Sequence, residues 1–143
     1  MRKIVATALL GLLAACGSNE DDTTTFKTPD GDTVTIAERK GESASWPEGF
    51  SPYPGAQVVS DMSMGTDDAS GQIITFESDD APDDIADFYR EQADTAGFTI
   101  NMDFKVDGDR LLTAEAPDGR TFSMNTDTVA DVTEVSLSMS GGG

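Results

Sequence analysis

The stretch DAPDDIADFYREQADTAGFTINMDFKV, residues 80–106, decides the fold because its apolar pattern changes at Gly97. Asp80 and Pro82 supply a cap and a first-turn proline, and the carboxylates that follow favour the positive end of a helix dipole. A mostly apolar stripe then repeats at three- and four-residue spacing, formed by Ile85, Phe88, Tyr89, Gln92, Ala93 and Ala96. Gly97 ends this pattern as a residue just past a helix does. The stretch predicts one amphipathic helix that faces a sheet.

A period of two follows the glycine and gives the clearest strand signal in the chain. Phe98, Ile100, Met102, Phe104 and Val106 alternate with polar residues. Further strands are expected near residues 56–64, 72–77, 111–116, 120–125 and 133–139. Such alternation indicates an antiparallel sheet with one buried and one wet face. The predicted class is α+β, with an antiparallel sheet of about five or six strands and one amphipathic helix packed on one face.

The methionines are expected to point inward. In the strand near residues 56–64, Val58, Met62 and Met64 share one face, while Val59, Asp61 and Ser63 share the other, and Ser60 is an exception on the first face. Met102, Met124 and Met139 also occupy predicted inward positions, where methionine commonly fills irregular cores. A Cu(I) site made of thioethers is the less favoured alternative.

A turn sequence and an aromatic segment precede these strands. Residues 26–45 are expected to form a small hairpin around Pro29-Asp30-Gly31, followed by a loop, and the same three residues recur at 117–119 as a reused turn. Residues 46–55 hold three prolines, so this segment must be extended and irregular. Trp46, Phe50 and Tyr53 then have two interpretations. They form a lid over the core, or they form an exposed surface that binds a partner or a glycan.

The first 16 residues have the three parts of an export signal. Arg2 and Lys3 precede an apolar run that is too short to span a membrane, and the run closes with Leu13-Ala14-Ala15-Cys16. This ending resembles a bacterial lipobox. It implies a signal peptide at 1–15 and lipid on Cys16. The residues that follow are polar, acidic and without apolar periodicity, which predicts a disordered tether over 16–25. An ordinary secretory signal and a buried core helix are the alternatives. In lipoproteins of this kind, an aspartate directly after the lipidated cysteine retains the protein in the inner membrane. Gly17 occupies that position here, which implies the periplasmic face of the outer membrane in a Gram-negative host.

The charge and the residue types exclude several classes of function. Cleavage leaves seven of the 9 Lys and Arg residues against 27 Asp and Glu, which is a net charge of −20. Such a field repels nucleic acid and anionic lipid surfaces. The chain has no histidine and a single cysteine, so Ser-His-Asp and Cys-His catalysis lack their base and zinc sites lack their ligands. No enzyme activity, no catalytic residue, no metal site and no cofactor are therefore expected.

Clustered carboxylates keep one alternative open. The clusters are Asp30/Asp32, Asp67/Asp68, Asp79/Asp80/Asp83/Asp84 and Asp107/Asp109. Ca²⁺ accepts such oxygens, but none of the clusters has EF-hand spacing, and each serves a turn or a helix start. Paired carboxylates could also catalyse glycoside hydrolysis, which requires a substrate cleft. A sheet with one helix and short turns has few elements from which to build such a cleft.

A family resemblance covers roughly residues 46–139. The order Tyr53-Pro54-Gly55-Ala56, a Gly- and Met-containing hairpin, then Phe88-Tyr89 in a helix ending at Gly97, resembles small bacterial lipoproteins and periplasmic domains of this type. The resemblance implies a fold over 46–139 and an envelope location, and it implies no activity or substrate. Residues 140–143 are expected to fray.

The expected function is a membrane-anchored, non-catalytic envelope lipoprotein that acts as an accessory or interaction module. Its expected partners are the membrane, through lipid on Cys16, and an envelope protein, with Trp46, Phe50 and Tyr53 or the wet face of the sheet as contact surfaces. The alternative is an acidic periplasmic protein that binds a ligand or a divalent cation.

Overall fold

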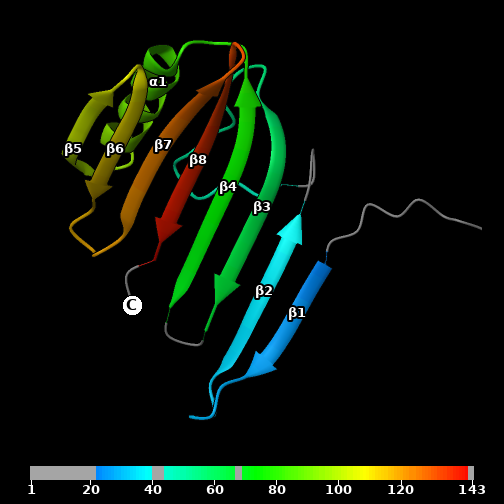
Figure 1. The fold of residues 1–143 in the computed structure, drawn as a ribbon. Coiled ribbons are helices and arrows are strands. Elements are labelled where there is room, and N and C mark those ends of the chain that lie inside the picture. Colours follow the sequence, from blue (N-terminus) through cyan, green and yellow to red (C-terminus); the bar gives the residue numbers. More distant parts are fainter. Residues whose placement is uncertain (1–21, 40–43, 67–68, 142–143) are drawn as a thin grey trace, which may run out of the picture.

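The structure is a computed structural model that describes residues 22–39, 44–66 and 69–141. Within these ranges it contains one helix and eight strands (Figure 1). The elements are β1 (Asp22–Lys27), β2 (Thr33–Arg39), β3 (Gln57–Gly65), β4 (Ser70–Ser78), α1 (Pro82–Thr95), β5 (Thr99–Val106), β6 (Asp109–Glu115), β7 (Thr121–Val129) and β8 (Val132–Ser140). The predicted signal peptide and Cys16 lie outside the described residues. Strand β1 begins inside the segment that was expected to be tether.

All eight strands join one antiparallel sheet in the order β1-β2-β3-β4-β8-β7-β6-β5. The α+β class, the antiparallel sheet and the single helix are confirmed. The predicted strand number of five or six is wrong. The hairpin of β1 and β2 does not stand apart, because β2 pairs along β3 with Ile36 opposite Met64 and adds two strands to the sheet.

One face of the sheet is covered and the other is not. Helix α1 packs over β5, β6 and β7, and the segment 44–56 lies on the same side over the centre of the sheet. The opposite face, toward the viewer in Figure 1, carries no helix or loop of the described chain. We call this the open face, and the other the helix-side face.

The helix ends agree with the sequence except for the cap. Pro82 occupies the first turn and Gly97 follows the last turn with φ +86°, a conformation that glycine adopts without strain. The N-cap residue is Ala81, whose side chain makes no capping hydrogen bond, so the predicted side-chain cap is absent. Asp83 and Asp84 in the first turn still place negative charge at the positive end of the helix dipole.

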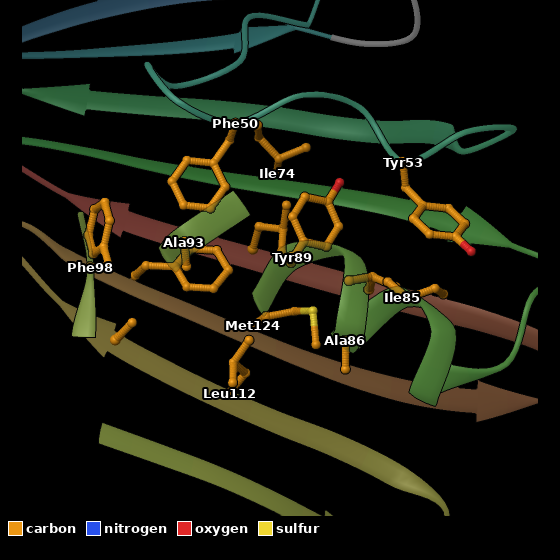
Figure 2. Close-up of a cluster of buried hydrophobic side chains, with 14 of the residues drawn as sticks. Phe50, Tyr53, Ile74, Ile85, Ala86, Tyr89, Ala93, Phe98, Leu112 and Met124 are labelled. Atoms are coloured by element: carbon orange, nitrogen blue, oxygen red, sulfur yellow. The ribbon is translucent and has the colours of Figure 1, made fainter. Parts of the chain in front are cut away.

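The core lies between the sheet and its two covering elements (Figure 2). It contains many aromatic side chains, and Figure 2 shows Phe50, Tyr53 and Tyr89 directed into this layer. The fully buried large side chains include Tyr89, Phe76, Phe122, Ile74, Ile85, Leu112, Met124 and Val135. Their burial supplies the main stabilisation of the fold.

Two β-bulges reverse the predicted faces of β3 and β5. The pairing register shifts between Val58 and Ser60, and again between Ile100 and Met102. A bulge inserts one extra residue, so every side chain beyond it points to the opposite face. Three predictions are therefore wrong. Met62 and Met64 lie on the open face, Met102, Phe104 and Val106 lie on the open face, and Asp61 points inward.

Candidate functional site

The aromatic segment is part of the core. Phe50 and Tyr53 are buried, and Trp46 is partly buried against Phe76 and Tyr89, with ring centroids 6.3 and 6.4 Å away. These rings cover the helix-side face as a lid, because packing there removes their apolar surface from water. The structure thus corrects the alternative in which Trp46, Phe50 and Tyr53 form an exposed contact surface.

Both tyrosines are tied down by their hydroxyl groups. The Tyr53 hydroxyl donates to Asp80 at 2.8 Å, and the Tyr89 hydroxyl donates to the Ser51 carbonyl at 3.3 Å. Burial and the neighbouring Asp80 raise the pKa of Tyr53 to about 12, and burial also raises the pKa of Tyr89. Neither hydroxyl is an available acid or base near neutral pH.

A buried carboxylate links the lid segment to the sheet. Asp61 is fully buried, and its Oδ2 accepts hydrogen bonds from the Ser45 N–H at 2.8 Å and the Ser45 hydroxyl at 3.2 Å. Its Oδ1 accepts from the Gln72 side-chain amide at 2.7 Å, and Gln72 also donates to the Ser45 carbonyl at 2.6 Å. Sequence reasoning missed this network because Asp61 was assigned to the wrong face of β3.

A groove of about 460 Å³ lies beside the lid on the helix-side face. Its floor comes from β2, β3, β4 and β8, and its rim includes Glu48 and Arg120. The lining residues are Thr35, Ala37, Pro47, Glu48, Ser63, Met64, Gly65, Ser70, Gly71, Gln72, Arg120, Met139, Ser140 and Gly141. This size and this mixture of apolar and polar groups fall in the range of small-molecule sites. The groove was not predicted from the sequence.

By contrast, the layer between the lid segment and strands β4 and β8 is filled. A void of only about 10 Å³ lies among Phe50, Ile74 and Leu137 in the described part of the core. That volume is too small for a ligand. A second hollow of about 310 Å³ lies between the lid segment and α1, lined by Gly49, Ser51, Phe88, Glu91, Gln92 and Thr95.

The open face carries two groups of exposed apolar side chains. On β3 and β4, Met62 pairs with Ile73, and Met64 lies two residues along. On β5 and β6, Phe104 pairs with Leu111 and is 56% exposed. The face between these groups is polar, and one row of paired residues crosses it: Met62, Ile73, Ser138, Ser123, Thr113 and Met102. Exposed apolar side chains in such groups are typical of contact surfaces.

Charged residues at the helix end of the sheet are paired with one another. Arg110 binds both Asp83 of α1, at 2.7 Å, and Asp103 of β5, while Lys105 binds Asp83 at 2.5 Å and Arg90 binds Asp103. Hydrogen bonds from Lys105 and Arg110 lower the pKa of Asp83. Partial burial acts to raise the pKa of Asp103, but Arg110 and Arg90 outweigh it and the pKa is lowered. This ion network joins α1 to the sheet.

The candidate metal ligands are dispersed. The five methionines of the strands lie on both faces, with Met124 buried in the core and Met62 exposed on the open face. Among the carboxylate clusters, Asp80 binds Tyr53, Asp83 is ion-paired, and Asp67/Asp68 lie outside the described residues. No group of three or more His, Cys, Asp or Glu that could hold a metal ion occurs within residues 22–39, 44–66 and 69–141.

Comparison with known families gives one match. Residues 58–128 are similar to a family described as START domain-like. The matched segment runs from β3 into β7 and includes α1, and it is just under half of the 143-residue chain. A helix packed on an antiparallel sheet is consistent with that similarity. No curated protein and no solved structure matches the chain.

No helix in the described part of the chain is long and apolar enough to cross a membrane.

Proposed function

We propose that this protein is a non-catalytic interaction module of the bacterial cell envelope. Lipid on Cys16 holds it at the periplasmic face of the outer membrane, and the open face of its sheet contacts an envelope protein. Two or more acyl chains make such an anchor durable, since each buried CH₂ contributes about 0.8 kcal/mol. The observation that carries the proposal is the uncovered open face, with Phe104, Val106, Met64 and Ile73 each more than 40% exposed.

The packing of the helix-side face supports this choice of surface. Its aromatic side chains are buried under α1 and the lid segment, so they offer no apolar contact to a partner. The open face has eight strands about 4.8 Å apart and covers roughly 34 by 24 Å, about 800 Å². That area is close to what one partner buries in a stable protein complex, about 800 Å².

The groove supports a second candidate function, which is binding of a small ligand. Its volume of about 460 Å³ suits a small molecule, and START domain-like proteins are generally binding domains. Gln72 stands at its floor and is held by the Asp61 network, so the groove has a positioned polar group. A ligand in the groove should shift the amide resonances of Gln72 and Met139 and leave those of Phe104 unchanged.

The anchor is tested by Cys16→Ser. We expect an uncleaved or mis-sorted precursor without lipid, whereas the wild-type protein partitions into the detergent phase of a phase-separation extraction. A normally trimmed Ser variant, together with wild-type protein in the aqueous phase, would contradict the lipid anchor.

The contact surface is tested by photocrosslinking in the native envelope. A photoreactive residue at Ser138, exposed in the middle of the open face, should crosslink reproducibly to one envelope protein. The same group at Thr95, exposed on α1, is the matched control and should not give that product. If the residue at Ser138 gives no product, or if both positions give the same product in equal amount, the open face is rejected as the contact surface.

A further inference from the structure

Three carboxylates form a line across the open face. Glu77 of β4 pairs with Glu134 of β8, and Glu134 also pairs with Asp127 of β7. Neighbouring strands are about 4.8 Å apart, so the three carboxylates span roughly 10 Å. All three are exposed, and none forms an ion pair within the described residues. We call them the acidic row.

Like charges at directly paired positions destabilise a sheet. The row therefore works against the stability of the protein that carries it. The same side chains would become favourable if a cationic partner lay over them, because each charge would then gain an opposite neighbour.

The cationic strand side chains that the structure describes lie on the helix-side face, whereas the acidic row lies on the open face. Lys105 and Arg110 point toward α1, where they bind Asp83, and Arg120 lies over the Phe98 ring on the helix-side face. Strand alternation likewise places Lys27 on the side opposite to the open-face residue Phe26. The electrostatic potential over the open face is therefore negative, and it becomes more negative toward the acidic row.

Apolar contact is available at a fixed distance from this charge. Ile73 lies four residues before Glu77 on β4, with both side chains on the open face, which separates them by about 13 Å. Met62 pairs directly with Ile73 and enlarges the apolar contact. A complementary segment must then carry basic residues about 13 Å from a group of apolar side chains.

Building on the function proposed above, we infer that the open face binds a cationic amphipathic segment of an envelope protein. Lys or Arg side chains of that segment reach the acidic row, and its apolar side chains pack on Met62 and Ile73. A second copy of this chain does not fit, since it would bring a second acidic row and a mature charge of −20 to the interface. An anionic lipid surface is repelled for the same reason.

The test uses the mature chain without its lipid and a synthetic helical peptide of about 18 residues, with leucines on one end of a face and lysines on the other. Binding is measured by fluorescence anisotropy at low and at physiological salt. The variant Glu77→Gln/Asp127→Asn/Glu134→Gln should weaken binding about tenfold. The control Glu48→Gln/Glu91→Gln/Asp94→Asn removes the same charge from the helix-side face and should change binding less than about twofold.

Each outcome decides the inference. The open-face variant should also raise the thermal midpoint, because it removes paired like charges, so its weaker binding does not reflect a lost fold. Equal weakening in both variants would mean non-specific charge attraction and would overturn the inference. Binding of the lipid-free chain to phosphatidylcholine vesicles, if Phe104→Ser abolishes it, would also overturn the inference. That result would assign the open face to a membrane.

The crosslinking experiment separates this inference from the proposed function. A Ser138 product whose crosslinked segment has no excess of Lys and Arg would overturn the inference and leave the interaction module standing. Absence of any Ser138 product would overturn the function itself.

Discussion

Replacing Asp61 by asparagine tests whether the buried carboxylate network holds the lid segment on the sheet. Each carboxylate oxygen of Asp61 accepts at least one hydrogen bond, Oδ2 from Ser45 and Oδ1 from Gln72. An asparagine keeps only one acceptor oxygen, and its NH₂ group must face either the Ser45 N–H or the Gln72 amide. With the NH₂ group toward Ser45, the Ser45 N–H loses its acceptor. With the NH₂ group toward Gln72, the Gln72 amide either loses its acceptor or turns over and gives up its hydrogen bond to the Ser45 carbonyl.

The expected loss follows from these contacts. A hydrogen bond to a charged group contributes about 1.5–3 kcal/mol, and an unsatisfied buried donor costs about 1–3 kcal/mol. Because the asparagine oxygen retains part of the network, we expect the free energy of unfolding to fall by about 2–3 kcal/mol. For a domain of this size the thermal midpoint should then fall by about 10 °C.

Guanidinium unfolding followed by Trp46 fluorescence is the assay. Trp46 is the only tryptophan and follows Ser45 directly, so its emission reports both global unfolding and release of the lid. The control is Asp94→Asn, an equal change at an exposed position of α1. A free energy of unfolding within about 0.5 kcal/mol of the wild type would refute the reasoning, since that is the range of ordinary surface substitutions.

Two further predictions concern pH. Because the pKa of Tyr53 is raised to about 12 and that of Tyr89 is also raised, their contribution to stability is complete below pH 10.0 and is lost as the pH rises through the folded values; phenolate absorbance at pH values between these limits should appear in denaturant and not in the folded protein. Asp83 and Asp103 have lowered pKa values, so their contribution is present above the usual value of 3.8 and is lost as the pH falls below it. Arg110→Met should flatten the acid side of the plot of thermal midpoint against pH, and an unchanged acid side would contradict the ion network.

The elements that could be predicted are those with local signals. Pro82 and Gly97 bracket α1 to within a few residues, because both act on their own backbone. The reused Pro-Asp-Gly turn is confirmed, since Gly31 and Gly119 have φ values of +96° and +85° and each closes a tight turn. The sequence also predicted the aromatic lid as one of two alternatives. The prolines force an extended segment, and its aromatic rings are stabilised by packing on an apolar surface.

The turn between β7 and β8 lacked such a signal. Ala130 and Asp131 both adopt positive φ, +51° and +67°, without a glycine. A left-handed alanine costs about 1–2 kcal/mol, so the sequence favours no turn at this position. The strand predicted at 120–125 therefore ended four residues before the end of β7, whereas the strand predicted at 133–139 began within one residue of the start of β8.

The candidate site could not be predicted, because it depends on register between distant strands. Glu77 and Glu134 meet only through the pairing of β4 with β8, and no periodicity within either strand specifies that pairing. Asp61 and the open-face apolar residues depend in addition on the two bulges. The extra residues near Val59 and Asn101 are ordinary strand residues, so nothing local marks a change of face.

The bulge in β5 connects the packing of the helix to the open face. Beyond it, Asp103 and Lys105 face α1 and form ion pairs, while Phe104 faces solvent. Without the bulge these positions would exchange, and Phe104 would be buried under the helix. Burying one such side chain contributes about 2 kcal/mol, whereas ion pairs as exposed as Arg90–Asp103 contribute about 0–1 kcal/mol each. The observed arrangement therefore gives up apolar burial under α1 and exposes that surface on the open face. Since positions that break a local rule are often functional ones, this exchange is expected if the open face is used for binding.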